Sequence, residues 1–275
     1  MRKNRIKDGW MQPPEGAARI AQVKAVSGMG TYALLENRYS RGYFIEGGKG
    51  GQLWQDIFRT VRNEGMECSL SLGKAGRPAV LQIICHSLKK LKFIDREMDG
   101  RMEEVDALLR VMDARLRPME LSERLEWLQL PGSNGMMKAY FLRRGRQVTA
   151  KFVNEVRELS GDTRIVMHME PVSNDAVQKN IWRLYGCPGS QPEDQNHFTS
   201  MSFLAFFMDS PENMAYIDRT LCSICSHYGQ EMAVLEEAEG KVPGGALSHF
   251  FGTSLEAGRY ARCYQTQAVG NLVNL

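Results

Sequence analysis

The sequence predicts an α+β fold, in which mixed or antiparallel sheets carry helices mainly on one face. Two kinds of apolar periodicity alternate along the chain: steps of two, typical of strands, and steps of three and four, typical of helices. In the second half, the order strand–helix–strand occurs twice, which is the split-βαβ, ferredoxin-like arrangement. Apolar residues make up 43% of the 275 residues and charged residues 24%, enough apolar surface for a real core.

The first half is predicted as a flexible basic lead over residues 1–18 and an α+β subdomain over residues 19–129. Residues 66–72 alternate apolar and polar side chains, which predicts an antiparallel strand with one face in water. A long helix over 94–116 carries an apolar stripe, and Pro118 stops it. The remaining predicted elements are strands at 19–26, 31–36, 39–45 and 79–86, and helices at 52–64 and 121–128.

The loop at 130–136 (LPGSNGM) is the predicted boundary, and a ferredoxin-like subdomain follows over residues 137–240. Its central helix has the clearest limits: Ser210 is placed to cap it, Pro211 takes its first position, and Gly229 suits a left-handed C-terminal cap. The other elements expected here are strands at 137–142, 163–170, 199–208 and 232–235, and helices at 147–159 and 174–185. A tail over 241–275 holds a helix at 244–251 and a strand at 262–269.

The net charge of +3 is concentrated at the N-terminus, where Arg2, Lys3, Arg5 and Lys7 stand against Asp8. The other residues are neutral on balance, so the excess indicates a basic tail and not a binding face.

Six cysteines in a chain of this length do not form a small disulfide scaffold, and we expect a reducing compartment. No stretch of about 18 apolar residues predicts a membrane span, and no apolar segment after the first charges predicts a secretory signal.

Cys222, Cys225 and His227 form the most chemically suggestive group, a C-x-x-C with a nearby histidine. A zinc site needs four ligands, and no second pair has useful spacing. A redox pair belongs at the start of a helix, whereas this one falls in the last turns of the helix that Gly229 ends. We therefore predict structural cysteines.

The other candidate sites are also interpreted as structural. The GGKGG segment at 47–51 contains Lys49 but lacks the P-loop pattern, so it is predicted as a flexible connection. Two basic clusters are predicted as solvated turns neutralised by nearby acidic residues; they are Lys89, Lys90 and Lys92, near Asp95 and Glu97, and Arg143, Arg144 and Arg146, near Glu155 and Glu158. The five histidines lie on different predicted elements, without metal-ligand spacing; they are His86, His168, His197, His227 and His249. No residue is assigned a catalytic, cofactor-binding or metal role.

Three stretches of the second half resemble the N-terminal domain of the VirB/TrbE/CagE-type ATPases of conjugation and type IV secretion. Residues 164–171 (RIVMHMEP) resemble the family's strand that ends in a proline turn. Residues 209–235 resemble its strand, helix and G-x-x-L unit, and residues 243–275 its linker into the motor domain. The hairpin at 30–47 and the helices at 103–128 match more loosely.

The resemblance implies a docking and assembly module on the cytoplasmic side of a secretion channel, peripheral to the inner face of the cell membrane. It implies inner-membrane channel components as partners, homo-oligomerisation through the parent ATPase, and no small-molecule substrate. Walker A and Walker B motifs are absent, so we expect this chain not to be an enzyme, and expect ATP and magnesium only in a motor domain beyond it.

Two other classes of function stay open at this point. A nucleic-acid-binding module is the main alternative, because ferredoxin-like sheets can present aromatic side chains to bases. Such a module needs exposed aromatics, whereas Phe203, Phe206 and Phe207 lie in a run that looks buried. The third class is a thiol-dependent enzyme that uses Cys222 or Cys225 with His227.

Overall fold

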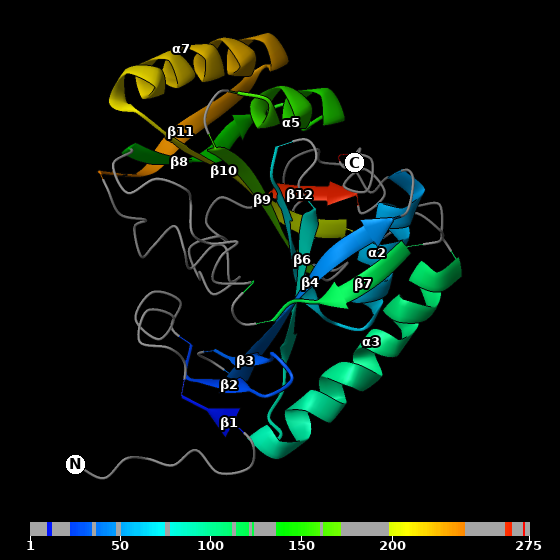
Figure 1. Cartoon of the computed structure of the whole chain (residues 1–275). Helices are drawn as coiled ribbons and strands as arrows, with labels where there is room; N and C mark the ends of the chain where they lie inside the picture. The colour runs from blue at the N-terminus through cyan, green and yellow to red at the C-terminus, as the bar shows by residue number, and fades with distance from the viewer. Residues whose placement is uncertain are drawn as a thin grey trace, which may run out of the picture.

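The computed structural model confirms an α+β fold with a large antiparallel sheet (Figure 1). It describes residues 10–12, 23–34, 37–47, 51–74, 78–111, 114–120, 123, 136–159, 162–171, 198–239, 262–265 and 272. The strands are β1 (Trp10–Met11), β2 (Ala25–Ser27), β3 (Tyr32–Ala33), β4 (Arg38–Gly47), β5 (Glu67–Leu72), β6 (Ala79–His86), β7 (Ala114–Pro118), β8 (Met136–Gly145), β9 (Asp162–Pro171), β10 (Phe198–Asp209), β11 (Gln230–Glu239) and β12 (Arg262–Gln265).

The described strands form one sheet in the order β1-β2-β3-β4-β6-β5-β9-β10-β8-β11, with β7 added to β4 and β12 added to β10. The pairings between the described strands are all antiparallel, as in β5 with β6 and β5 with β9. The β5–β9 pairing joins the strands of the two predicted subdomains into a continuous sheet.

The described helices all contribute to one core on a single face of this sheet, as predicted. They are α2 (Gly51–Asn63), α3 (Ile94–Val111), α5 (Ala150–Arg157) and α7 (Pro211–Tyr228), with a 3-10 turn, η2 (Leu91–Phe93), before α3. Each presents an apolar stripe, such as Ile94, Met98 and Met102 on α3, to the same side of the strands. None of these helices is long and apolar enough to span a bilayer.

In the second half, α5 connects β8 to β9, and α7 connects β10 to β11. The strands lie in the order β9-β10-β8-β11, so each strand–helix–strand unit has a strand of the other unit between its own two. The two helices lie side by side in Figure 1, and the rings of Phe152 and Tyr228 meet edge to face between them, 5.7 Å apart.

Helix α7 has the limits that the sequence predicts. The Ser210 side chain accepts a hydrogen bond from the backbone N–H of Asn213, and Pro211 is the first helical residue. Gly229 has φ 61°, the left-handed conformation that a C-terminal cap requires. The buried stripe includes Met214, Ile217, Leu221 and Cys225.

The predicted helix over 94–116 is wrong at its C-terminal end. Helix α3 stops at Val111, and residues 114–118 form β7, which pairs with β4 from Tyr43 to Gly47. An apolar residue at 116 fits a helical stripe and a strand equally well. Here the backbone hydrogen bonds offered by the edge of β4 decide the outcome.

The prediction that residues 66–72 have one face in water is also wrong. Ser69 and Ser71 are both 0% exposed. Strand β5 lies in the middle of the sheet, between β6 and β9, and the sheet is buried there on both faces. Short hydroxyl side chains are compatible with a buried face and with a face in water. The alternation of apolar and polar residues therefore could not distinguish the two.

The outcomes of the other predictions differ. The hairpin between β3 and β4 is present, and Asn37 takes φ 58° at its turn. Strand β1 lies within the segment predicted as a lead, and Trp10 is buried. The predicted helices 174–185 and 244–251 lie outside the described residues, as do all but one residue of helix 121–128 and of the boundary loop 130–136.

Candidate functional site

Polar side chains cross the middle of the sheet on the face opposite the helices. Ser69 on β5 is the cross-strand partner of Gln82 on β6 and of His168 on β9, and His168 is in turn opposite Ser202 on β10. These four residues, which we call the polar row, are at most 4% exposed. Gln82 Oε1 and Ser202 Oγ have no hydrogen-bond partner among the described residues. Each unsatisfied buried polar atom costs about 1–3 kcal/mol of folding free energy. The polar row is therefore a candidate functional site.

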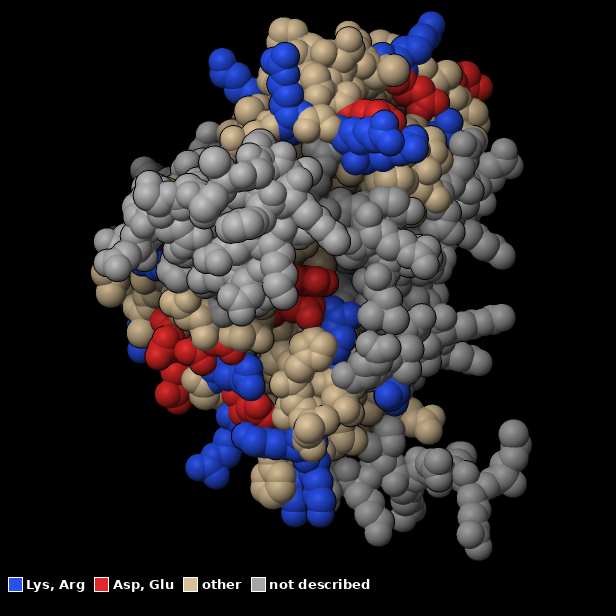
Figure 2. All heavy atoms as spheres, turned by 180° about the vertical axis from the view of Figure 1, so that it is seen from behind, with Lys and Arg blue, Asp and Glu red and all other residues tan. Residues whose placement is uncertain are grey.

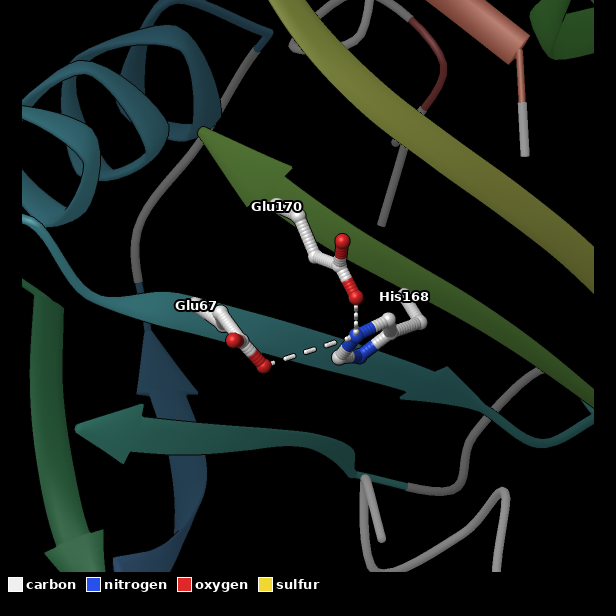
Figure 3. A group of neighbouring side chains, drawn as sticks. All are labelled: Glu67, His168 and Glu170. Carbon is white, nitrogen blue, oxygen red and sulfur yellow. Dashed lines mark hydrogen bonds and ion pairs between the residues drawn. The ribbon is translucent and has the colours of Figure 1, made fainter. Parts of the chain in front are cut away.

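Polar side chains from four strands meet beside the polar row, around its member His168. On β5, the Glu67 carboxylate accepts a hydrogen bond from Arg38 Nη2 at 2.5 Å through Oε2, and its Oε1 lies 2.8 Å from His86 Nε2. His168 lies with Nδ1 2.7 Å from Ser69 Oγ and Nε2 3.1 Å from Glu170 Oε1. Figure 3 shows Glu67 reaching from β5 toward His168 and Glu170, which both come from β9. We call Arg38, Glu67, His86, His168 and Glu170 the ion-pair cluster.

The ion-pair cluster is electrostatically matched. Arg38 is 6% and His168 4% exposed, so both place polar groups where unpaired charge would be costly. The hydrogen bond from His168 lowers the pKa of Glu170, against an opposing effect of burial, and the charges of His168, Arg38 and His86 lower it further. The Arg38 guanidinium therefore has a carboxylate beside it, and Glu67 and Glu170 each have a basic side chain within hydrogen-bond distance.

Glu67, His168 and Glu170 offer ligand atoms within 4.8 Å of one another, a spacing at which a metal ion could bind. His168 Nε2 would face the ion, and Ser69 would orient the ring through Nδ1. The Arg38 guanidinium, however, bonds the same Glu67 oxygen that lies 3.7 Å from Nε2. A cation would have to displace Arg38 and overcome its repulsion. We therefore interpret the group as an ion-pair cluster that fastens β4, β5, β6 and β9 together.

The sequence predicts each histidine as an isolated structural residue, and this convergence is not predicted. His86 and His168 meet Glu67 only because β5 pairs with both β6 and β9. The available signal was the run of polar residues at alternate positions in two strands. That signal could not say which strands are neighbours. His227 is exposed on α7 beside the ring of Tyr228, and His197 and His249 lie outside the described residues.

The C-x-x-C segment has the features of structural cysteines. Cys222 is exposed, whereas Cys225 belongs to the buried stripe of α7. Burial raises the pKa of the Cys225 thiol to about 11, which disfavours the reactive thiolate form. Cys68, Cys85, Cys222 and Cys225 are free thiols.

The aromatic residues of β10 are not available to stack on bases. Phe203, Phe206 and Phe207 are at most 1% exposed. Figure 2 shows Asp and Glu side chains beside Lys and Arg over much of the visible described surface, without one broad basic face. In the second basic cluster, Arg143 faces Glu231 at 3.4 Å. Lys49 lies outside the described residues.

No family model matches this chain, and no curated protein matches it. Among solved structures, it is similar to xylooligosaccharide oxidase from Myceliophthora thermophila, at 10% identity and TM-score 0.36, covering 72% of this chain and 46% of that one. It is also similar to 6-hydroxy-D-nicotine oxidase from Arthrobacter nicotinovorans, at 12% identity and TM-score 0.36, covering 86% and 51%. A third neighbour is aclacinomycin oxidoreductase, at 11% identity and TM-score 0.34, covering 70% and 42%. The chain spans about half the length of these three proteins.

The prediction that this chain is not an enzyme is contradicted by these neighbours, because all three are named as oxidases or oxidoreductases. We do not maintain that prediction. Similarity at this level of identity and TM-score transfers no reaction, substrate or cofactor to the chain.

Proposed function

We propose that this chain is a docking and assembly module of a conjugative type IV secretion ATPase, as its family resemblance implies. The observation that carries the proposal is the strand order β9-β10-β8-β11 with α5 and α7 on one face. We infer that this half is ferredoxin-like, since two strand–helix–strand units interleave as in a split βαβ pair.

The segments that resemble the family overlap helices and strands of the structure, which supports the proposal. Residues 164–171 fall within β9 and reach its last residue, Pro171. Residues 209–235 cover the end of β10, helix α7 and the first half of β11. The stretch 30–47 covers the hairpin of β3 and β4.

The outer face of α7 is the surface that we assign to a channel component. Tyr216 is 52% exposed there, with the exposed charged residues Glu212 and Arg219 on either side of it along the helix. Tyrosine and arginine are both enriched in protein interfaces. In this proposal the chain lies at the cytoplasmic face of the membrane and joins neighbouring copies through the parent ATPase.

Co-purification tests this proposal directly. The tagged chain is co-expressed with the inner-membrane channel components of its own secretion system, extracted in detergent and captured. We expect a channel component to elute in a fixed ratio with the wild-type chain. Tyr216→Asp is expected to reduce that ratio at least tenfold, because it places a charge in the centre of the contact.

Val111→Asp is the matched control, because Val111 is 85% exposed at the end of α3, on another part of the molecule. It is expected to leave capture unchanged. If the wild-type chain captures no channel component, the proposed function is wrong. If Val111→Asp and Tyr216→Asp weaken capture equally, the assignment to α7 is wrong.

A further inference from the structure

Three large apolar side chains are exposed at one end of the molecule. Leu88 is 92%, Met29 55% and Phe93 49% exposed. Leu88 and Phe93 belong to the segment that leads from β6 into α3, and Met29 lies in the turn between β2 and β3. In Figure 1 this turn and the start of α3 lie together at the lower end of the molecule. We call these three residues, with Lys89, Lys90 and Lys92, the Leu88 patch.

Hydrogen bonds hold the two parts of the Leu88 patch together. Asp95, in the first turn of α3, accepts from Ser27 Oγ at 2.9 Å and from Thr31 Oγ1 at 2.5 Å. Ser27 and Thr31 flank the turn that carries Met29. These hydrogen bonds connect the β2–β3 turn, which carries Met29, to the start of α3, which follows Leu88 and Phe93.

The segment under Leu88 is also fastened. Ser87 is buried, and its N–H donates to the carbonyl of Asn37 at 3.0 Å. Its hydroxyl donates to Glu97 at 2.6 Å and accepts from the N–H of Lys89 at 3.1 Å. Leu88 thus projects into solvent from a backbone that is bonded on both sides of it.

The Leu88 patch keeps positive charge because the nearby acidic groups are shared with arginines. The sequence predicts that Asp95 and Glu97 neutralise the three lysines. In the structure, Asp95 is engaged by Arg41 at 3.1 Å, and Glu97 by Arg101 at 2.9 Å. Lys89 keeps only a 3.6 Å approach to Glu97. Figure 2 shows Lys and Arg side chains gathered beside uncharged residues at this lower end.

We propose that the Leu88 patch docks onto an anionic lipid bilayer. Leu88, Phe93 and Met29 would enter the boundary between headgroups and acyl chains, and the lysines would meet lipid phosphates. A nucleic acid would use the lysines but would leave the apolar side chains in water. A bilayer uses both. Lys92 Nζ lies 4.9 Å from the centroid of the Phe93 ring, which places charge and apolar surface at the same site.

This inference extends the proposed function to the membrane, but its test uses lipid alone and is independent of any channel component. The full chain is floated with vesicles of phosphatidylcholine, with or without about one-third phosphatidylglycerol, at about 0.1 M salt. We expect flotation with the anionic vesicles only. Each lysine near such a surface contributes about fivefold, so Lys89→Gln/Lys90→Gln/Lys92→Gln is expected to weaken binding on the order of a hundredfold.

Leu88→Ser/Phe93→Ser is expected to weaken binding at least tenfold without changing net charge. Its matched control is Val111→Ser/Val234→Ser, since Val111 and Val234 are 85% and 51% exposed away from the patch. The charge control is Arg143→Gln/Arg144→Gln/Lys151→Gln, which removes three exposed cations elsewhere. Both controls should float like the wild type.

Three results would overturn the inference. The first is a wild-type chain that stays unbound with anionic vesicles. The second is equal loss in the patch variants and their controls, which would indicate a general charge effect. The third is an apolar double variant that floats normally while the lysine variant loses single-stranded nucleic acid binding, which would assign the lysines to a nucleic acid.

Discussion

At the residue scale, Glu67 makes the largest number of contacts within the ion-pair cluster. Its carboxylate meets Arg38 on one oxygen and His86 on the other, with His168 further away. Three strands other than its own therefore depend on this side chain. Removing its charge leaves the buried Arg38 guanidinium without a partner, and such losses are expensive.

Glu67→Gln should lower the free energy of unfolding by about 2 kcal/mol. Urea denaturation followed by circular dichroism measures it. Glu104→Gln is the control, because Glu104 is exposed on α3, and it should change stability by less than about 0.5 kcal/mol. If the two variants have equal free energies of unfolding, the ion-pair cluster does not stabilise the fold.

The lowered pKa of Glu170 predicts how the free energy of unfolding depends on pH. The hydrogen bond from His168 holds its pKa below the ordinary glutamate value in the folded protein. A lowered folded-state pKa stabilises the fold above the ordinary value, near pH 4.3, and that stability is lost as pH falls through the lower folded-state pKa. Glu170→Gln should therefore flatten the acid limb of the unfolding free energy. An unchanged acid limb would contradict the role of His168 as donor.

At the element scale, secondary structure is predictable where local chemistry and packing agree. Helix α7 has a capping serine, a first-turn proline and a terminal glycine, and its limits are as predicted. Helix α3 ends early, because β4 offers an edge to residues 114–118. Its N-terminal stripe was predictable and its C-terminal limit was not, since only the neighbouring strand distinguishes the alternatives.

Gly145, at the end of β8, lies in close contact with the start of β11. It has φ 141°, and a Cβ there would lie 2.6 Å from the Gly229 carbonyl oxygen. Gly145→Ala should cost at least about 2 kcal/mol of stability. Gly100→Ala is the opposite case, because a Cβ at this position in α3 meets open space, and it should stabilise by up to about 1 kcal/mol. Thermal unfolding of both variants measures the difference in sign.

At the scale of the whole molecule, the β5–β9 pairing makes the two halves of the sheet continuous. Leu70 on β5 is opposite Met167 on β9, and both are 0% exposed in the shared core. Neither half buries these side chains without the other. The halves should therefore unfold together.

Fluorescence of Trp54, on α2, and hydrogen exchange in β10 should report the same unfolding midpoint in urea. Ser69→Pro should separate the two midpoints, because proline removes a ladder hydrogen bond from a central strand. Two separate transitions in the wild-type chain would show that the halves are independent and that the pairing contributes little.

The sequence by itself determined the α+β class, the side-chain periods of the main strands and the limits of α7, because caps and apolar spacing act over a few residues. Only the tertiary structure decided which strands are neighbours. That pairing brings Glu67, His86 and His168 together across the sheet and buries Ser69 and Ser71, and the tertiary fold pairs Asp95 with Arg41. Contacts between residues distant in the sequence depend on strand order, and strand order leaves no mark in any local stretch.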